Sequence, residues 1–105
     1  MLNEQEKIEV LHEAIKLIES GTCSFICVAL NSAIYDKVNT DIKLLTTSGD
    51  IIKKYFFDIY KAIEEEGIKQ NPEFVMGRIW KSASKEFRIQ WLNNFLKQLK
   101  NEIDH

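Results

Sequence analysis

Apolar residues recur at intervals of three and four positions in several stretches of this chain, the spacing of one face of an α-helix. The first stretch runs from Asn3 to about Glu19. Asn3 is followed three positions later by Glu6, which is the capping-box pattern, and Gly21 is a plausible helix-terminating residue. The predicted apolar stripe of this helix consists of Ile8, Leu11, Ile15 and Ile18.

The second stretch, from Thr22 or Ser24 to Tyr35, is apolar nearly all round. Its length and its alanines favour a helix over a strand, so we predict that it is the core helix of the domain. Residues 36–48 are rich in turn-forming residues. They are predicted to form a loop with one short helical or extended piece.

One long helix is predicted over Gly49–Glu66, with Thr47 or Ser48 as its cap. Gly67 followed by Ile68 has the pattern of a Schellman ending, in which the residue after the glycine packs back on the helix. The predicted buried stripe consists of Ile52, Tyr55, Phe56, Ile59 and Ile63.

Two further helices are predicted in the C-terminal third. Asn71-Pro72-Glu73 supplies a cap, a proline at the first position and an acid in the first turn of a short helix. A soft break near Ser82–Ser84 precedes a last helix that ends near Ile103. The apolar side of this last helix is expected to carry Phe87, Trp91 or Leu92, Phe95, Leu96, Leu99 and Ile103.

These elements add up to an all-α fold, a compact bundle of four to five helices forming a single domain over residues 1–105. The composition, with 45% hydrophobic and 29% charged residues, is that of an ordinary globular protein. No apolar run approaches the ~20 residues of a membrane helix. The acidic, polar start MLNEQEKIEV is not that of a signal peptide. We therefore expect a cytoplasmic protein without membrane contact.

Two cysteines, Cys23 and Cys27, lie four positions apart and would share one face of a helix. They could be half of a metal site or a redox pair, and His12 could complete a zinc site if the first two helices packed as a hairpin. The favoured interpretation is two buried, reduced thiols, because the spacing is not C-x-x-C and no second ligand pair follows. No metal or cofactor is predicted.

Catalytic motifs are absent from the sequence: it has no phosphate-binding loop, dinucleotide-binding glycine motif, zinc-protease motif or nucleophile elbow. An enzyme built on His12, Cys23 and Cys27 is the least favoured of three hypotheses. The chain is predicted to bind rather than to catalyse.

Four basic residues near the C-terminus stand at helical spacing: Arg78, Lys81, Lys85 and Arg88. If the chain is helical through Ser82–Ser84, all four project from one face, flanked by Trp80 and Trp91. Such a face could bind a nucleotide, with an indole stacked on the base, or an acidic partner. The alternative is a solvated basic face. The isoelectric point of about 5.7 argues against general nucleic-acid binding.

A second candidate surface lies in the aromatic segment Tyr55–Tyr60. Consecutive helix positions point about 100° apart, so if Phe56 faces the core, Phe57 lies toward a flank. Exposed aromatics usually mark interfaces, although core packing would also explain the cluster. The predicted interface residues are Phe57, Tyr60, Glu64, Glu65 and Glu66.

The three glutamates at 64–66 are either a solvated acidic corner or a docking site for a basic partner. Charge is also unevenly distributed along the chain. Residues 1–66 carry 7 Lys/Arg against 12 Asp/Glu, a net charge of −5, and residues 67–105 carry 7 against 4, a net charge of +3. An acidic face could therefore meet a basic face within one fold or between copies, and we expect a homo-oligomer.

Two segments, ESGTCSFICVALNSA and FRIQWLNNFLKQL, resemble small, mostly uncharacterised helical proteins of bacteriophages and mobile elements. The resemblance carries no catalytic residue across. It implies an accessory protein that works by binding, and such proteins often block a host defence protein or sequester its nucleotide signal. The first hypothesis is therefore a non-enzymatic binding protein for a host protein or an anionic nucleotide. The second is a structural or adaptor module with no small ligand.

Overall fold

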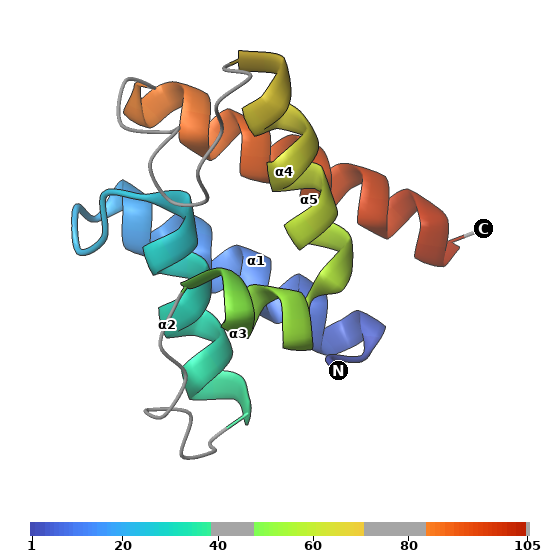
Figure 1. Ribbon diagram of the computed structural model, residues 1–105. Helices are drawn as coiled ribbons and strands as arrows, with labels where there is room; N and C mark the ends of the chain where they lie inside the picture. The colour runs from blue at the N-terminus through green and yellow to red at the C-terminus, as the bar shows by residue number, and fades with distance from the viewer. Residues whose placement is uncertain (39–47, 71–83, 105) are drawn as a thin grey trace.

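The computed structural model describes residues 1–38, 48–70 and 84–104, which form five α-helices and no strand (Figure 1). The helices are α1 (Glu4–Glu19), α2 (Ile26–Val38), α3 (Ser48–Tyr55), α4 (Phe57–Gln70) and α5 (Lys85–Asp104). The predicted all-α bundle of four to five helices is confirmed. Predictions for residues 39–47 and 71–83, including the short helix after Asn71, lie outside the described residues.

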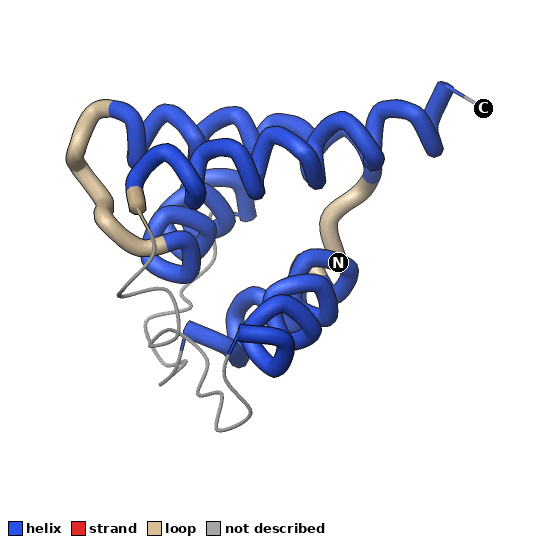
Figure 2. The backbone as a smooth tube through the Cα atoms, turned by 90° about the horizontal axis from the view of Figure 1, so that it is seen from above, coloured by secondary structure: helices blue, strands red, loops and turns tan. Residues whose placement is uncertain are grey.

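The helices are arranged around α1. α1 and α5 lie side by side and run in opposite directions, and α2, α3 and α4 lie on one side of this pair (Figures 1 and 2). α1 packs against both α2 and α5, and α2 packs against α3. The largest side chains fully buried between these helices are Phe56, Leu11, Ile18, Ile26, Leu30, Ile34, Ile52, Ile59, Ile63 and Leu92. Within the described ranges, no helix is both long and apolar enough to cross a bilayer.

α1 begins and ends where its sequence predicts. Asn3 Oδ1 accepts the Glu6 N–H at 2.8 Å, and Glu6 Oε1 accepts the Asn3 N–H at 3.0 Å, which completes the capping box. After α1, Gly21 has a φ of +81° and donates its N–H to the Ile18 carbonyl at 3.1 Å. Glycine adopts this left-handed conformation without the strain that a side chain would add.

α2 is the predicted core helix, displaced toward the C-terminus. It begins at Ile26 and ends at Val38, so Thr22 and Ser24 belong to the turn that links it to α1. Its buried residues are Ile26, Cys27, Ala29, Leu30, Ala33 and Ile34. These residues form one broad buried face, and the apolar Val28 on the other side of the helix is 45% exposed.

The middle of the chain holds two helices where the sequence predicts one over Gly49–Glu66. α3 ends at Tyr55, α4 begins at Phe57, and the two point in different directions (Figure 1). The Tyr55 carbonyl accepts the N–H of the buried Leu2 at 3.0 Å. An outside donor inserted into the hydrogen-bond ladder is a known cause of helix bends. The prediction of a continuous helix is wrong because a distant segment of the chain supplies this donor.

α4 also ends later than predicted. Gly67 is buried inside the helix, which continues to Gln70, and Ile68 is 54% exposed. The predicted Schellman ending, with Ile68 packed back on the helix, is therefore wrong. The predicted stripe is otherwise correct: Ile52, Phe56, Ile59 and Ile63 are fully buried, and Tyr55 is half-buried.

α5 begins at Lys85, with Ser84 as its cap. The Phe87 N–H donates to Ser84 Oγ at 3.0 Å, and the Arg88 N–H donates to the Ser84 carbonyl at 3.1 Å. Ser84 is not helical, so a continuous helix does not pass through it. Of the predicted apolar side, Leu92, Leu96 and Leu99 are buried, Trp91 and Phe95 are half-buried, and Phe87 is exposed.

Candidate functional site

The described part of the predicted basic stripe is used inside the fold. Arg88 is only 8% exposed and donates from Nη1 to the Ser24 carbonyl at 2.8 Å. Its guanidinium carbon lies 5.2 Å from the centre of the Phe25 ring, within cation–π range. Lys85 Nζ donates to the Glu19 carbonyl at 2.9 Å. Lys85 and Arg88 thus join the start of α5 to the end of α1 and to the connection that follows it.

The stripe as predicted also requires helix through Ser82–Ser84, and this condition fails at Ser84. Arg78, Lys81 and Trp80 lie outside the described residues. A nucleotide site on this stripe stays a prediction, and the burial of Arg88 argues against that residue as one of its contacts.

Trp91 lies in a hollow between α4 and α5 with a volume of about 280 Å³, here called the Trp91 hollow. Its indole stacks on Phe95, with ring centres 6.1 Å apart and planes at 21°. The lining residues are Glu66 from α4 and Phe87, Gln90, Trp91 and Asn94 from α5. Glu66 is half-buried and accepts a hydrogen bond from Gln70 Nε2 at 3.2 Å. A hollow lined by an aromatic residue and a carboxylate is an environment that suits a cationic side chain.

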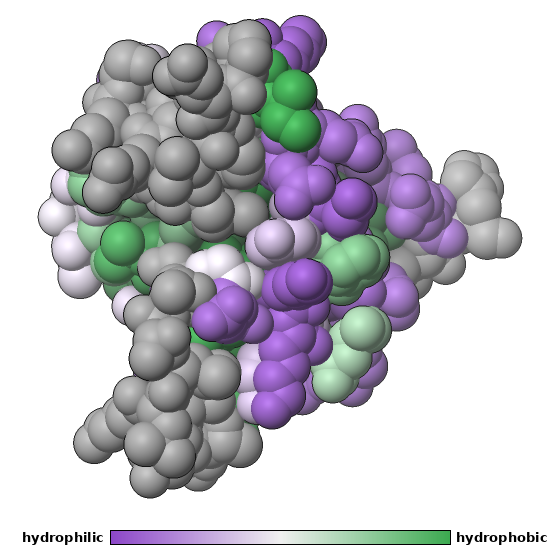
Figure 3. All heavy atoms as spheres, in the orientation of Figure 1, coloured by the Kyte–Doolittle hydropathy of each residue, from purple (hydrophilic) through white to green (hydrophobic). Residues whose placement is uncertain are grey.

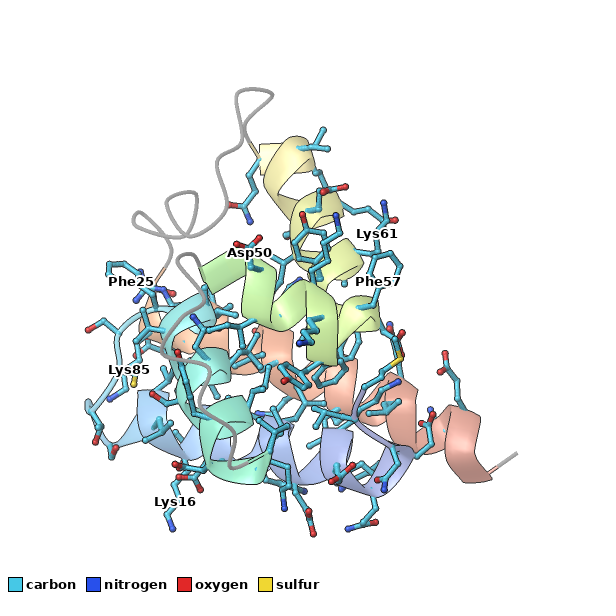
Figure 4. The ribbon with its side chains drawn as sticks, turned by 60° about the horizontal axis from the view of Figure 1, so that its bottom comes forward. Lys16, Phe25, Asp50, Phe57, Lys61 and Lys85 are labelled. Carbon is cyan, nitrogen blue, oxygen red and sulfur yellow. The ribbon has the colours of Figure 1, made fainter. Side chains whose placement is uncertain are left out.

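Phe57 and Tyr60 of the predicted interface lie together on one side of α4. Phe57 is 40% exposed and stacks on Tyr60 with ring centres 6.2 Å apart, whereas Phe56 is fully buried. The predicted orientation of these two phenylalanines is confirmed. Lys53 Nζ lies 5.7 Å from the centre of the Tyr60 ring. Phe57 and Lys61 project on the same side of α4, away from α1 and α5 (Figure 4).

The three glutamates of the acidic corner have different surroundings. Glu64 is half-buried and accepts a hydrogen bond from Lys61 Nζ at 3.3 Å. Glu66 lines the Trp91 hollow. Glu65 is exposed. The corner is therefore divided between two surfaces. On the face drawn in Figure 3, hydrophobic side chains reach the surface as separate patches among hydrophilic ones.

The cysteines and His12 do not come together as a site. Cys23 lies in the turn before α2, so the predicted shared helix face with Cys27 is wrong. Both cysteines are buried in the core and form no disulfide, as the favoured interpretation expects, and His12 is exposed on α1. Among the described residues, no three His, Cys, Asp or Glu side chains are placed to hold a metal ion.

Sequence reasoning missed Lys7, which is 6% exposed. Its Nζ donates to Asp58 Oδ2 at 2.8 Å and lies 5.7 Å from the centre of the Phe56 ring. A signal was available: Lys7 stands one helical turn before the buried Leu11, on the core side of α1. A lysine at such a position must find a partner for its charge.

Comparisons with models of protein families, with curated proteins and with solved structures found no match to this chain. Its function therefore has to be inferred from the surfaces described above.

Proposed function

We propose that this chain is a non-enzymatic binding protein that recognises a basic side chain of a partner protein in the Trp91 hollow. The observation that carries the proposal is one hollow lined by both Glu66 and Trp91, whose indole stacks on Phe95. Tryptophan is enriched among the residues that dominate binding energy at interfaces. A partner's arginine or lysine would stack on the indole while Glu66 meets its charge.

A nucleotide ligand is the second candidate, and the basic stripe is its support. Lys85 and Arg88 donate to backbone carbonyls at the end of α1 and in the α1–α2 connection, which weakens this candidate relative to a protein partner. The adaptor hypothesis, in contrast, shares its chemistry with the main proposal, because both act through protein contacts.

The biological setting is proposed from the resemblance alone. Small helical proteins of bacteriophages and mobile elements suggest a host defence protein as the partner. Two buried cysteines that form no disulfide suit a reducing compartment, so we also propose a cytoplasmic location.

The test uses tryptophan fluorescence in a Trp80→Phe background, which leaves Trp91 as the reporter. We expect a short arginine-rich peptide to quench the signal, and an acidic peptide and ATP to leave it unchanged. Glu66→Gln should weaken peptide binding at least about fivefold, the loss expected when a charge-assisted contact becomes a neutral one. Glu65→Gln, a change of the same chemistry at the neighbouring exposed position, should bind as the parent does.

Two results would contradict the proposal. Equal weakening by Glu65→Gln and Glu66→Gln would mean that the peptide responds to net charge rather than to the Trp91 hollow. A response to ATP without a response to the basic peptide would move the assignment to the nucleotide candidate.

A further inference from the structure

α4 carries a row of four residues on its outer side, here called the α4 row. Phe57 and Ile68, 40% and 54% exposed, are its ends, and Lys61 and Glu64 stand between them. The successive spacings are four, three and four positions, the pattern of one seam of a coiled coil. The row is about 16 Å long at the rise of an α-helix.

The opposite side of α4 is already used by the core. Ile59 and Ile63 are fully buried, and Gly67 is buried as well. The central pair of the row remains at the surface: the side chains of Lys61 and Glu64 are 49% and 34% exposed and lie 3.3 Å apart. α4 therefore has an inner apolar stripe that belongs to the fold and an outer row, apolar at its ends and charged at its centre, that faces solvent.

The α4 row matches itself when read in the opposite direction. In an antiparallel helix pair related by a two-fold axis, all pairs of seam positions that face each other have residue numbers that add up to the same value. The numbers 57 and 68 add up to the same value as 61 and 64. Phe57 would then oppose Ile68 of a second copy, and Lys61 would oppose Glu64 of that copy, each contact occurring twice.

Apolar residues thus meet apolar ones, and each charge meets a complementary one. An unrelated partner would not require this internal symmetry, whereas a second copy does.

We infer that α4 pairs with α4 of a second copy of this chain, antiparallel, through the α4 row. The two Lys61–Glu64 contacts at the centre fix the register at some cost in stability, as polar residues in a coiled-coil seam do. One helix pair is a small interface, so the dimer forms at concentrations of micromolar and above. This inference is independent of the Trp91 hollow.

Charge reversal tests the pairing by sedimentation velocity. Lys61→Glu and Glu64→Lys should each raise the dimer dissociation constant at least tenfold, because each places like charges opposite each other twice. An equimolar mixture of the two variants should dimerise again, since every contact between unlike chains then joins opposite charges. Within each variant chain, positions 61 and 64 still carry the same charge in this mixture. Recovered dimerisation therefore cannot come from a restored ion pair within one helix.

Lys69→Glu is the matched control for the charge change. Lys69 is exposed on the same helix, roughly 100° around it from the α4 row, and its reversal should leave the dissociation constant unchanged. Thermal unfolding should be nearly the same for all variants, because Lys61 and Lys69 are exposed and Glu64 is only partly buried.

Engineered cysteines test the register. Phe57→Cys and Ile68→Cys chains should form a mixed disulfide on oxidation when combined. Neither should cross-link with itself, since like positions lie about 16 Å apart in the antiparallel pair. The native thiols are buried, so the parent chain serves as the background control.

Three results would overturn the inference: a parent chain that stays monomeric at several hundred micromolar, a dimer that survives both charge reversals, or cross-linking of like positions. The first would exclude a dimer of useful strength. The other two would place the dimer contact elsewhere or in a parallel orientation.

Discussion

A nearly buried cation makes a long-range hydrogen bond near each end of α1, and each bond reaches a point where two helices meet or are connected. At the N-terminal end, Lys7 donates to Asp58 and lies over the Phe56 ring, beside the break between α3 and α4. At the other end, Arg88 of α5 donates to the Ser24 carbonyl in the connection between α1 and α2. The two cations have almost the same exposure, 6% and 8%.

The difference lies in what each cation meets. Among the contacts between described residues, Lys7 meets the full charge of Asp58, whose side chain is half-exposed, whereas Arg88 donates to a neutral carbonyl and lies over the face of Phe25. An ammonium is compact and strongly hydrated, so its burial requires a charged partner. A guanidinium is planar and less strongly hydrated, so it can donate in its plane and stack on an aromatic ring. The residue type at each end therefore fits the kind of contact available there.

The largest effect is expected at the ring beneath Lys7. Phe56 is fully buried and also packs edge-on against Phe95 with ring centres 5.9 Å apart. Phe56→Ala should lower the free energy of unfolding in urea by about 3–5 kcal/mol. Phe25→Ala removes a half-buried ring and should cost about 1–2 kcal/mol. Equal losses of unfolding free energy in the two variants would mean that Phe56 and Phe25 contribute equally to the core.

A smaller effect is expected from the charges at the N-terminal end. Asp58→Asn leaves Lys7 without its full counter-charge and should cost about 1–3 kcal/mol, a range reduced for the partial exposure of Asp58. Lys7→Met replaces the cation with an apolar side chain of similar length and should change stability by about 1 kcal/mol or less. Urea unfolding of both variants and of the double variant checks this order. A greater loss from Lys7→Met than from Asp58→Asn would break the interpretation.

At the other end, the shape of the cation should matter more than its charge. Arg88→Lys should cost about 1–2 kcal/mol, because one ammonium cannot both reach the Ser24 carbonyl and stack on Phe25. The matched control is Lys85→Arg on the same helix, where the contact with the Glu19 carbonyl is exposed and stability should stay within about 0.5 kcal/mol. Thermal unfolding compares the two variants. A tolerated Arg88→Lys would show that charge alone holds this end.

The smallest effect is expected at an exposed pair between α1 and α2. The hydrogen bond that Lys37 donates to Glu9 holds the pKa of the Glu9 carboxyl below its usual value. The Lys37–Glu9 pair therefore stabilises the fold at pH values above the ordinary pKa of a glutamate. This stabilisation is lost as the pH falls through the lowered pKa of Glu9. Because the pair is exposed, Glu9→Gln should leave the melting temperature at pH 7 nearly unchanged and alter only the acid limb of its pH profile. Glu13→Gln on the same helix is the control, and a large loss at pH 7 would contradict this view.

Local signals in the sequence were sufficient where neighbouring residues supply the interaction. The Asn3–Glu6 capping box and the glycine turn at Gly21 involve residues within four positions of each other, and both form as predicted. The apolar periodicity likewise predicts the buried faces of α1 and α4, because helical spacing alone places those side chains on one side. The half-burial of Trp91 and Phe95 was not predictable in this way, since it depends on which helices cover them. Alanine at either position should therefore cost less than the loss of a fully buried ring.

The candidate site shows the same division. Trp91 and Glu66 were predicted for two different surfaces, and the structure brings them into one hollow because α4 and α5 lie beside each other there. Arg88 was predicted to face a ligand, and it is instead turned inward to the α1–α2 connection. Helical spacing places a residue on a face, but it does not say which neighbour that face meets.

The sequence by itself determined the helical class, the caps of α1 and the identity of the core helix, because these depend on backbone propensity and on spacing within one helix. The tertiary structure decided the break at Phe56, the burial of Lys7 and the inward turn of Arg88. Each of these depends on a donor or acceptor more than fifty positions away along the chain: Leu2 for Tyr55, Asp58 for Lys7 and Ser24 for Arg88. Hydrogen bonds and charge pairs of this kind exist only after the helices have packed, so no local sequence pattern can predict them.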